Sequence, residues 1–236
     1  MKVAVVYGNA RHGSTWNTVQ LYLQELNQYG TNEITEFYLP KDMPHFCVGC
    51  FTCFLKGENS CPHAESVQPI AKALQESDII VLASPVYGLD VTGSMKALID
   101  HLCYMWISHR PAPEMFQKVG VVFATTAGAG TSHTAKTMRN SLQFWGIKRV
   151  YTVKKAVSAL KWEEVSEKNK TKLRKKTARI AQSSVRSLNR IGRVPVPFII
   201  RVMFGLMRGM QKKNSWNETD RAYWESNGWL AGKNPF

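Results

Sequence analysis

The 236-residue sequence lacks an uninterrupted apolar run of about 18 residues, which argues against a helix that crosses a membrane. Its first ten residues hold one lysine and a short apolar stretch. They lack the longer hydrophobic region and small-residue cleavage site of a signal peptide. We therefore expect a cytoplasmic protein, a setting in which structural disulfides are uncommon.

Acidic residues are scarce, 17 against 31 lysines and arginines, but the imbalance belongs to one segment. Residues 148–213 hold 19 basic and 3 acidic side chains, whereas the remaining residues hold 12 and 14. Such a segment attracts nucleic acid, anionic lipid or a phosphorylated cofactor, although a solvated helix face explains it too. Because aromatic residues are not interleaved with the basic ones as in stacking platforms, we expect no nucleic-acid partner.

The hydrophobic pattern predicts short buried strands that alternate with helices. Strands are expected at residues 3–7, 34–39, 79–82, 119–123 and 150–153. Helices are expected after the first strand and at residues 64–77, 94–106 and 132–145. Buried strands that alternate with helices favour an α/β fold in which a parallel sheet is covered on both faces.

The last third of the chain has a different pattern, and we expect a basic helical C-terminal extension over residues 156–236, after a first domain of residues 1–155. A long basic helix is predicted at 163–191 and, after a Gly/Pro break, a second helix at 198–210. The second helix is apolar except for one narrow stripe: Arg201, Gly205, Arg208 and Lys212. This favours packing between subunits over contact with a membrane surface or a lid. We expect the aromatic tail at 223–230 to fold back onto the domain.

Three loops should meet at the edge of the sheet where the parallel strands end, which is where such sheets bind ligands. The first, residues 8–15, opens a helix whose free N–H groups suit a phosphate, with Arg11, Ser14 and Thr15 nearby. It lacks both G-x-G-x-x-G and the Walker A pattern, which weakens dinucleotide and nucleoside triphosphate interpretations. An ordinary solvated turn fits this loop as well.

The second loop, residues 84–88, carries Tyr87, which can lie flat against a planar ring. The third, residues 125–131, is built of small residues that let the backbone approach a ligand closely. Each of these loops alone also fits a plain connection between a strand and a helix. The three together predict a site for a flat ring that carries a phosphate.

The loop sequences GNARHGST, SPVYG with the downstream MKALIDH, and TTAGAG occur in this order within about the first 150 residues. They resemble the flavodoxin-like NAD(P)H-dependent FMN reductases, a group that includes iron–sulfur flavoproteins. The resemblance implies a doubly wound five-stranded parallel sheet of order 2-1-3-4-5. It also implies bound FMN, with NAD(P)H as the electron donor.

The same resemblance assigns the residues of an FMN site. Arg11, Ser14 and Thr15 would hold the phosphate, beside Asn9, which stands where the family has a serine. The isoalloxazine would be lined on one side by Pro85, Val86, Tyr87 and Gly88, and on the other by Thr126, Ala127 and Gly128.

The function that follows is an FMN-dependent NAD(P)H oxidoreductase that passes electrons to an unidentified small molecule or protein. We assign no catalytic side chain, because hydride transfer between two rings needs no acid or base. His12, His109 and His133 lie in or near the expected site loops and are candidates for contact with reacting groups. The aromatic-rich helix at 94–106 builds a dimer in the resembling family, so we expect a homodimer or a higher homo-oligomer.

Four of the five cysteines, Cys47, Cys50, Cys53 and Cys61, form C-x2-C-x2-C-x7-C. Thiolates at this density suit a [4Fe–4S] cluster or, less well, zinc. A metal-free loop packed with phenylalanines and a transient disulfide are the alternatives. The spacing resembles the compact motif of iron–sulfur flavoproteins, so the alternative function is an electron-transfer or redox-sensing iron–sulfur flavoprotein. His45 and His63 flank the run as further candidate ligands, although surface histidines are the simpler interpretation.

Overall fold

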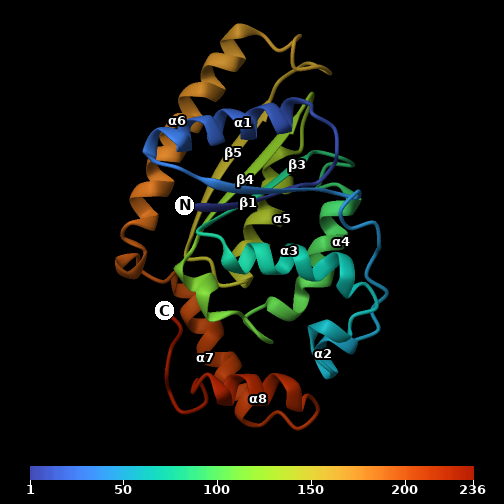
Figure 1. The fold of residues 1–236 in the computed structure, drawn as a ribbon, viewed down its shortest axis with the longest axis vertical. Coiled ribbons are helices and arrows are strands. Elements are labelled where there is room, and N and C mark those ends of the chain that lie inside the picture. Colours follow the sequence, from blue (N-terminus) through green and yellow to red (C-terminus); the bar gives the residue numbers. More distant parts are fainter.

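Five parallel strands form the centre of the structure, a computed structural model that describes residues 1–236 (Figure 1). They are β1 (Lys2–Tyr7), β2 (Glu33–Tyr38), β3 (Ile79–Pro85), β4 (Val119–Thr126) and β5 (Arg149–Ala156). Their order in the sheet is β2-β1-β3-β4-β5, which confirms the expected doubly wound α/β topology. The central strands are apolar and buried on both faces, as in parallel sheets generally.

Helices cover both faces of this sheet (Figure 1). One face carries α1 (Ser14–Leu26) and α6 (Glu167–Leu188), which pack against each other. The other carries α3 (Ala64–Glu76), α4 (Gly93–His101) and α5 (Thr131–Phe144). Side chains of a strand point alternately to the two faces, so along β1 Val3 and Val5 join the first core while Ala4 and Val6 join the second.

Two helices are shorter than the sequence pattern predicts. The helix expected at 94–106 ends at His101 and continues as a 3-10 helix over Leu102–Met105, in which Leu102, Tyr104 and Met105 are buried. The basic helix expected at 163–191 spans only Glu167–Leu188. Ser166 caps its N-terminus by accepting the N–H of Asn169.

The C-terminal residues form a third hydrophobic cluster at one end of the molecule. It contains side chains from α7 (Phe198–Lys212) and α8 (Glu218–Ser226), together with Ile107 and Phe116 of the preceding domain. Trp224 and Trp229 are buried there, which confirms that the aromatic tail folds back. The division at residue 155 stays a prediction. The basic helix α6 packs on the sheet, whereas α7 and α8 pack beside it.

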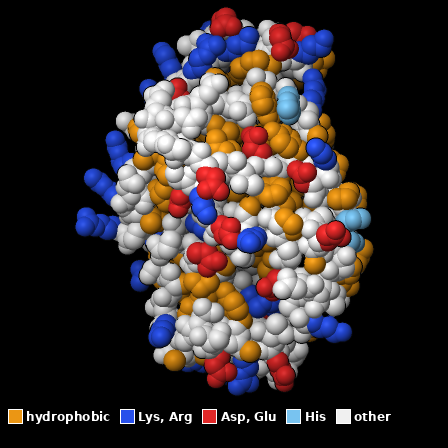
Figure 2. All heavy atoms as spheres, viewed as in Figure 1, with side chains coloured by type: hydrophobic (Ala, Val, Ile, Leu, Met, Phe, Trp, Pro, Cys, Tyr) orange, Lys and Arg blue, Asp and Glu red, His pale blue; other side chains and the backbone are white.

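The helix α7 buries Ile200 and Phe204 against its own chain, and several of its other apolar side chains are exposed. None of the helices is both long and apolar enough to span a bilayer. Lys and Arg side chains project along the edge of the molecule that α6 forms (Figure 2). The basic side chains of α6 are mostly exposed, which fits the interpretation of a solvated helix face; the other basic residues of 148–213 lie outside this helix.

Candidate functional site

The loops that follow β1, β3 and β4 meet around one cavity of about 120 Å³ at the carboxyl edge of the sheet. Nine of the eleven predicted site residues line it: Asn9, Arg11, Ser14, Thr15, Pro85, Val86, Tyr87, Thr126 and Ala127. Gly88 and Gly128 belong to the same loops but do not line the cavity. Gly13 and Thr125 of the predicted loops line it too, and Ala159 and Leu160, which lie outside the three loops, complete it.

The N-terminus of α1 faces this cavity with unpaired N–H groups. Gly13 is the cap residue, and no side chain caps the helix. The first N–H with a helical acceptor is that of Asn17, which donates to the Gly13 carbonyl at 3.0 Å. The amides of residues 14–16 thus have no partner in the protein, and the helix dipole places partial positive charge there. This donor set fits a phosphate.

Two hydrogen bonds fasten the first loop to its neighbours. Thr15 Oγ1 lies 2.7 Å from Thr125 Oγ1 at the end of β4, and both side chains are buried. The Arg11 guanidinium donates to the Leu160 carbonyl at 2.6 Å, beyond the end of β5. No carboxylate pairs with Arg11, so its charge adds to the positive potential of the helix end.

The other two loops pack against each other. A Cβ at Gly130, where φ is +97°, would lie 2.7 Å from Val86 Cγ1, so only glycine permits this approach. Tyr87 is 53% exposed, and its hydroxyl accepts a hydrogen bond from the Asn9 amide at 3.1 Å. The Tyr87 ring therefore offers a flat surface beside the phosphate-type donors.

The three histidines named from the sequence have separate environments. His12 stacks on Trp16 with ring centroids 4.5 Å apart, and His133 lies 3.3 Å from the Asp90 carboxylate in the second loop. His109 is not at this site, and that prediction was wrong. It contacts buried Asp220 of the C-terminal extension, because the chain turns away from the sheet edge after α4.

The four clustered cysteines line a second cavity, of about 50 Å³, between the short helix α2 (Thr52–Leu55) and the start of α3. All are free thiols. A hydrogen bond with Thr52 lowers the pKa of the exposed Cys50 thiol. Burial raises the pKa of the Cys53 thiol, and the neighbouring thiols raise it further. Four thiols around one cavity fit the donor set of an iron–sulfur cluster or a soft metal ion.

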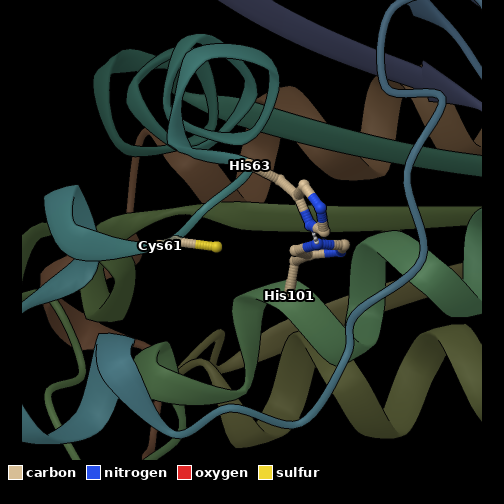
Figure 3. A group of neighbouring side chains, drawn as sticks. All are labelled: Cys61, His63 and His101. Carbon is tan, nitrogen blue, oxygen red and sulfur yellow. Dashed lines mark hydrogen bonds between the residues drawn. The ribbon is translucent and has the colours of Figure 1, made fainter.

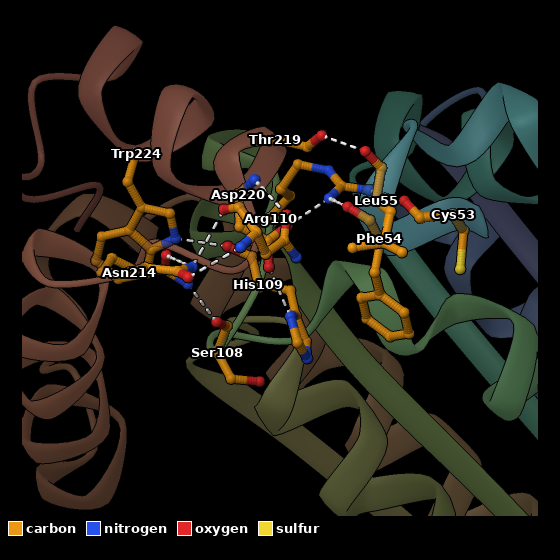
Figure 4. A network of polar contacts seen from close by, with 12 residues as sticks. Cys53, Phe54, Leu55, Ser108, His109, Arg110, Asn214, Thr219, Asp220 and Trp224 are labelled. Atoms are coloured by element: carbon orange, nitrogen blue, oxygen red, sulfur yellow. Dashed lines mark hydrogen bonds and ion pairs between the residues drawn. The ribbon is translucent and has the colours of Figure 1, made fainter. Parts of the chain in front are cut away.

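The cysteine loop is held by the C-terminal extension (Figure 4). Arg110 is nearly buried and donates to the backbone carbonyls of Cys53 and Phe54. The same guanidinium pairs with the fully buried Asp220 of α8, and Thr219 Oγ1 donates to the Leu55 carbonyl at 2.7 Å. The partners are between 56 and 164 residues apart in the sequence, so no local sequence pattern predicts this network.

The strand order and the loop cavity at the carboxyl edge of the sheet define a flavodoxin-like α/β protein. A solved azoreductase from Bacillus anthracis strain Sterne has the same fold, with a TM-score of 0.62 and 17% identity, over 78% of this chain and 99% of the other. An FMN-dependent NADH-azoreductase from Bacillus anthracis strain Ames Ancestor, solved in complex with FMN, gives a TM-score of 0.59 and 12% identity, over 77% and 100%. At these identities the likeness concerns the fold alone.

Sequence similarity identifies the family. The family model described as NADPH-dependent FMN reductase matches residues 1–163, so the chain belongs to that family. An iron–sulfur flavoprotein of Archaeoglobus fulgidus is 33% identical over 149 residues, which is 62% of this chain. The match spans 64% of the length of that relative. The resemblance carried by the three loop sequences is thereby confirmed.

Proposed function

We propose that this protein is an FMN-dependent NAD(P)H oxidoreductase whose FMN binds in the cavity formed by the three loops. The observation that carries the proposal is the uncapped N-terminus of α1, with its unpaired amides, at the same cavity as the exposed Tyr87 ring. When bound, FMN supplies the redox chemistry, taking an electron pair from a nicotinamide and passing it to an acceptor. Membership of the NADPH-dependent FMN reductase family supports the same assignment.

The chain's own residues bind and orient the cofactor. The amides of residues 14–16, the hydroxyls of Ser14 and Thr15, the Arg11 guanidinium and Asn9 hold the phosphate end. The ring would lie between two loops, with Pro85, Val86 and Tyr87 on one side and Thr126 and Ala127 on the other. Gly88 and Gly128 belong to the same two loops. No side chain acts as an acid or base, so orientation and exclusion of water are the contribution of the protein.

The assembly is a homodimer at least, located in the cytoplasm, and the acceptor is a small molecule or a protein. Support for the dimer comes from the second loop, where Tyr87 and Leu89 remain 53% and 65% exposed beside the cavity. These exposed apolar side chains lie at an open side of the cavity. A second subunit that packed against them would remove them from water and would cover the flavin ring on that side.

The visible spectrum of the purified protein tests this function, recorded before and after addition of NADH or NADPH. We expect flavin absorption that bleaches with the nicotinamide. The Ser14→Glu variant places a carboxylate at the phosphate end, and we expect it to weaken FMN binding at least tenfold while leaving riboflavin, which has no phosphate, almost unaffected. Gln182→Glu adds the same charge on the exposed face of α6 and serves as the control. Equal FMN affinity in both variants would contradict the assigned site.

A second candidate function is electron transfer or redox sensing through an iron–sulfur cluster. It is favoured by the four thiols around one cavity and by the name of the Archaeoglobus fulgidus relative. Anaerobic purification should then give iron and acid-labile sulfide, lost in Cys47→Ser and kept in Cys103→Ser. Protein that holds no iron or sulfide even after anaerobic reconstitution would rule this candidate out.

A further inference from the structure

Beside the cysteine loop, one thiol and two imidazoles converge in a way that the four-cysteine pattern does not require (Figure 3). Cys61 and His63 precede α3, and His101 is the last residue of α4. Their ligand atoms all lie within 4.8 Å of one another. In the sequence His63 flanks the cysteine run as a candidate ligand, whereas nothing local marks His101, which is 38 residues away.

The orientation of His101 is fixed by its own helix. Its Nδ1 lies 2.8 Å from the Ala97 carbonyl oxygen and must carry a proton to donate there. The Nε2 atom is then left with its lone pair free. A histidine that binds a metal through one ring nitrogen commonly donates the other N–H to a carbonyl in this manner. His101 is buried, so this orientation is maintained by packing as well.

The second imidazole meets that lone pair at a suitable distance. His63 Nδ1 lies 3.0 Å from His101 Nε2. Two nitrogens bound to one tetrahedral zinc ion, each at about 2.0–2.1 Å, are separated by about 3.3 Å. Joint coordination of one ion therefore needs only a small increase of this distance, together with a reorientation of the His63 ring, the less buried of the two, so that both lone pairs point at the ion.

Space and donor chemistry complete the site. The cavity of about 50 Å³ is lined by Cys61, His63 and His101. An ion and one water fit, since a water occupies about 30 Å³. Two imidazole nitrogens and one thiolate are the ligands that zinc prefers, and three protein ligands leave the fourth position to water.

We propose that Cys61, His63 and His101 form a binding site for a single zinc ion, independent of the flavin site. Binding releases the thiol proton of Cys61, and the His63 proton moves from Nδ1 to Nε2, so that both imidazoles bind as neutral ligands. Because Cys61 belongs also to the four-cysteine run, a chain that holds zinc here cannot use that thiol for a four-cysteine cluster. The loop therefore has two mutually exclusive metal-binding modes.

Zinc titration of the reduced, metal-free full-length chain against a chromophoric chelator tests the site. The variant in which Cys47, Cys50 and Cys53 are all replaced by serine should still bind one zinc ion, with a Kd within about threefold of the wild-type value. Made in this triple-serine variant, Cys61→Ser and His63→Ala should each weaken binding at least a hundredfold. His45→Ala is the matched control, because His45 stacks on His63 but is not among the three converging ligands.

Cobalt substitution supplies an independent readout. The triple-serine variant loaded with Co²⁺ should show absorption typical of a tetrahedral ion with one thiolate ligand, and His101→Gln should abolish it while circular dichroism verifies the fold. Loss of zinc binding in the triple-serine variant would show that the ion uses the four cysteines, and would overturn the proposal. Unchanged affinity in His63→Ala, or weak binding in His45→Ala, would overturn it equally.

Discussion

The flavin-type cavity and the cysteine loop are constructed by opposite means. At the cavity the donors are chiefly main-chain N–H groups and hydroxyls at the ends of buried strands, so a rigid sheet positions them. The cysteine loop has almost no regular structure, with Phe51 in the left-handed region at φ +58°, and its ligands are side chains. It is held by Arg110 and by α8, far away in the sequence. A strand end can therefore be recognised locally, whereas the loop depends on the C-terminal extension.

The prediction with the largest expected effect removes the buried carboxylate of Asp220. In Asp220→Ala the Arg110 guanidinium, 6% exposed, loses a partner that is 0% exposed. Breaking a buried pair costs about 3–5 kcal/mol when the remaining charge has no other partner. Arg110 keeps Glu58 at 3.2 Å, so the loss should fall at the lower end of this range. We expect urea unfolding to show a loss of that size, and hydrogen exchange to show faster opening of residues 50–58. Flavin affinity should be unchanged, because no residue of α8 lines that cavity.

The control for this prediction is the exposed pair Lys72–Glu76, whose charges lie 3.8 Å apart. An exposed pair contributes about 0–1 kcal/mol, so Glu76→Ala should lower the free energy of unfolding by no more than about 1 kcal/mol. Equal losses in the two variants would mean that the extension does not hold the loop.

A second, smaller test acts on the flavin-type cavity. Gly130→Ala places a methyl group 2.7 Å from Val86 Cγ1 at a positive φ, and must displace the loop that carries Tyr87. We expect FMN affinity to fall about tenfold, which corresponds to about 1.4 kcal/mol. Gly232→Ala has the same backbone strain, at φ +106°, with nothing within 4 Å of the new methyl. Titration with FMN should show a loss only in the first variant. A similar loss of FMN affinity in both variants would show that the contact between residue 130 and Val86 is not its cause.

The same contrast explains what sequence could predict. The strands and their order were accessible because β1, β3 and β4 are continuous apolar runs, and the loop sequences after them resemble a known family. The end of α4 was missed because Leu102–Met105 continue the apolar pattern although they form a buried 3-10 turn. Pattern alone does not separate these two geometries.

Long-range partners account for most of the remaining omissions. His101 forms a hydrogen bond with His63, 38 residues away in the sequence, and Arg11 donates to the Leu160 carbonyl, 149 residues away. Thr125 pairs with Thr15 across 110. His101 and Leu160 are unremarkable in their local sequence, because their positions at these sites depend on how separate elements pack. A contact of this kind becomes visible only when the fold is known.

The smallest expected effect compares two thiols in the metal-free, reduced protein. A hydrogen bond of 2.6 Å with Thr52 Oγ1 lowers the pKa of Cys50, whereas burial raises the pKa of Cys103 to about 11. The thiolate is the form that reacts with iodoacetamide, so alkylation of Cys50 should reach its plateau at a lower pH than that of Cys103. The alkylation rates of the two thiols are compared at about pH 8, close to the pKa of about 8.5 of an ordinary thiol. Mass spectrometry of the alkylated peptides measures them.

Thr52→Val keeps the shape of the side chain and removes the hydroxyl, so it should slow alkylation of Cys50 a few-fold, with no effect on Cys103. Ser60→Ala removes a hydroxyl from the same loop that donates to the Lys56 carbonyl and touches no thiol, and its rates should match the wild type. If Thr52→Val reacts at the wild-type rate, the acidity of Cys50 does not come from the Thr52 hydroxyl. The hydrogen bond with Thr52 would then not distinguish Cys50 in acidity from an ordinary surface cysteine.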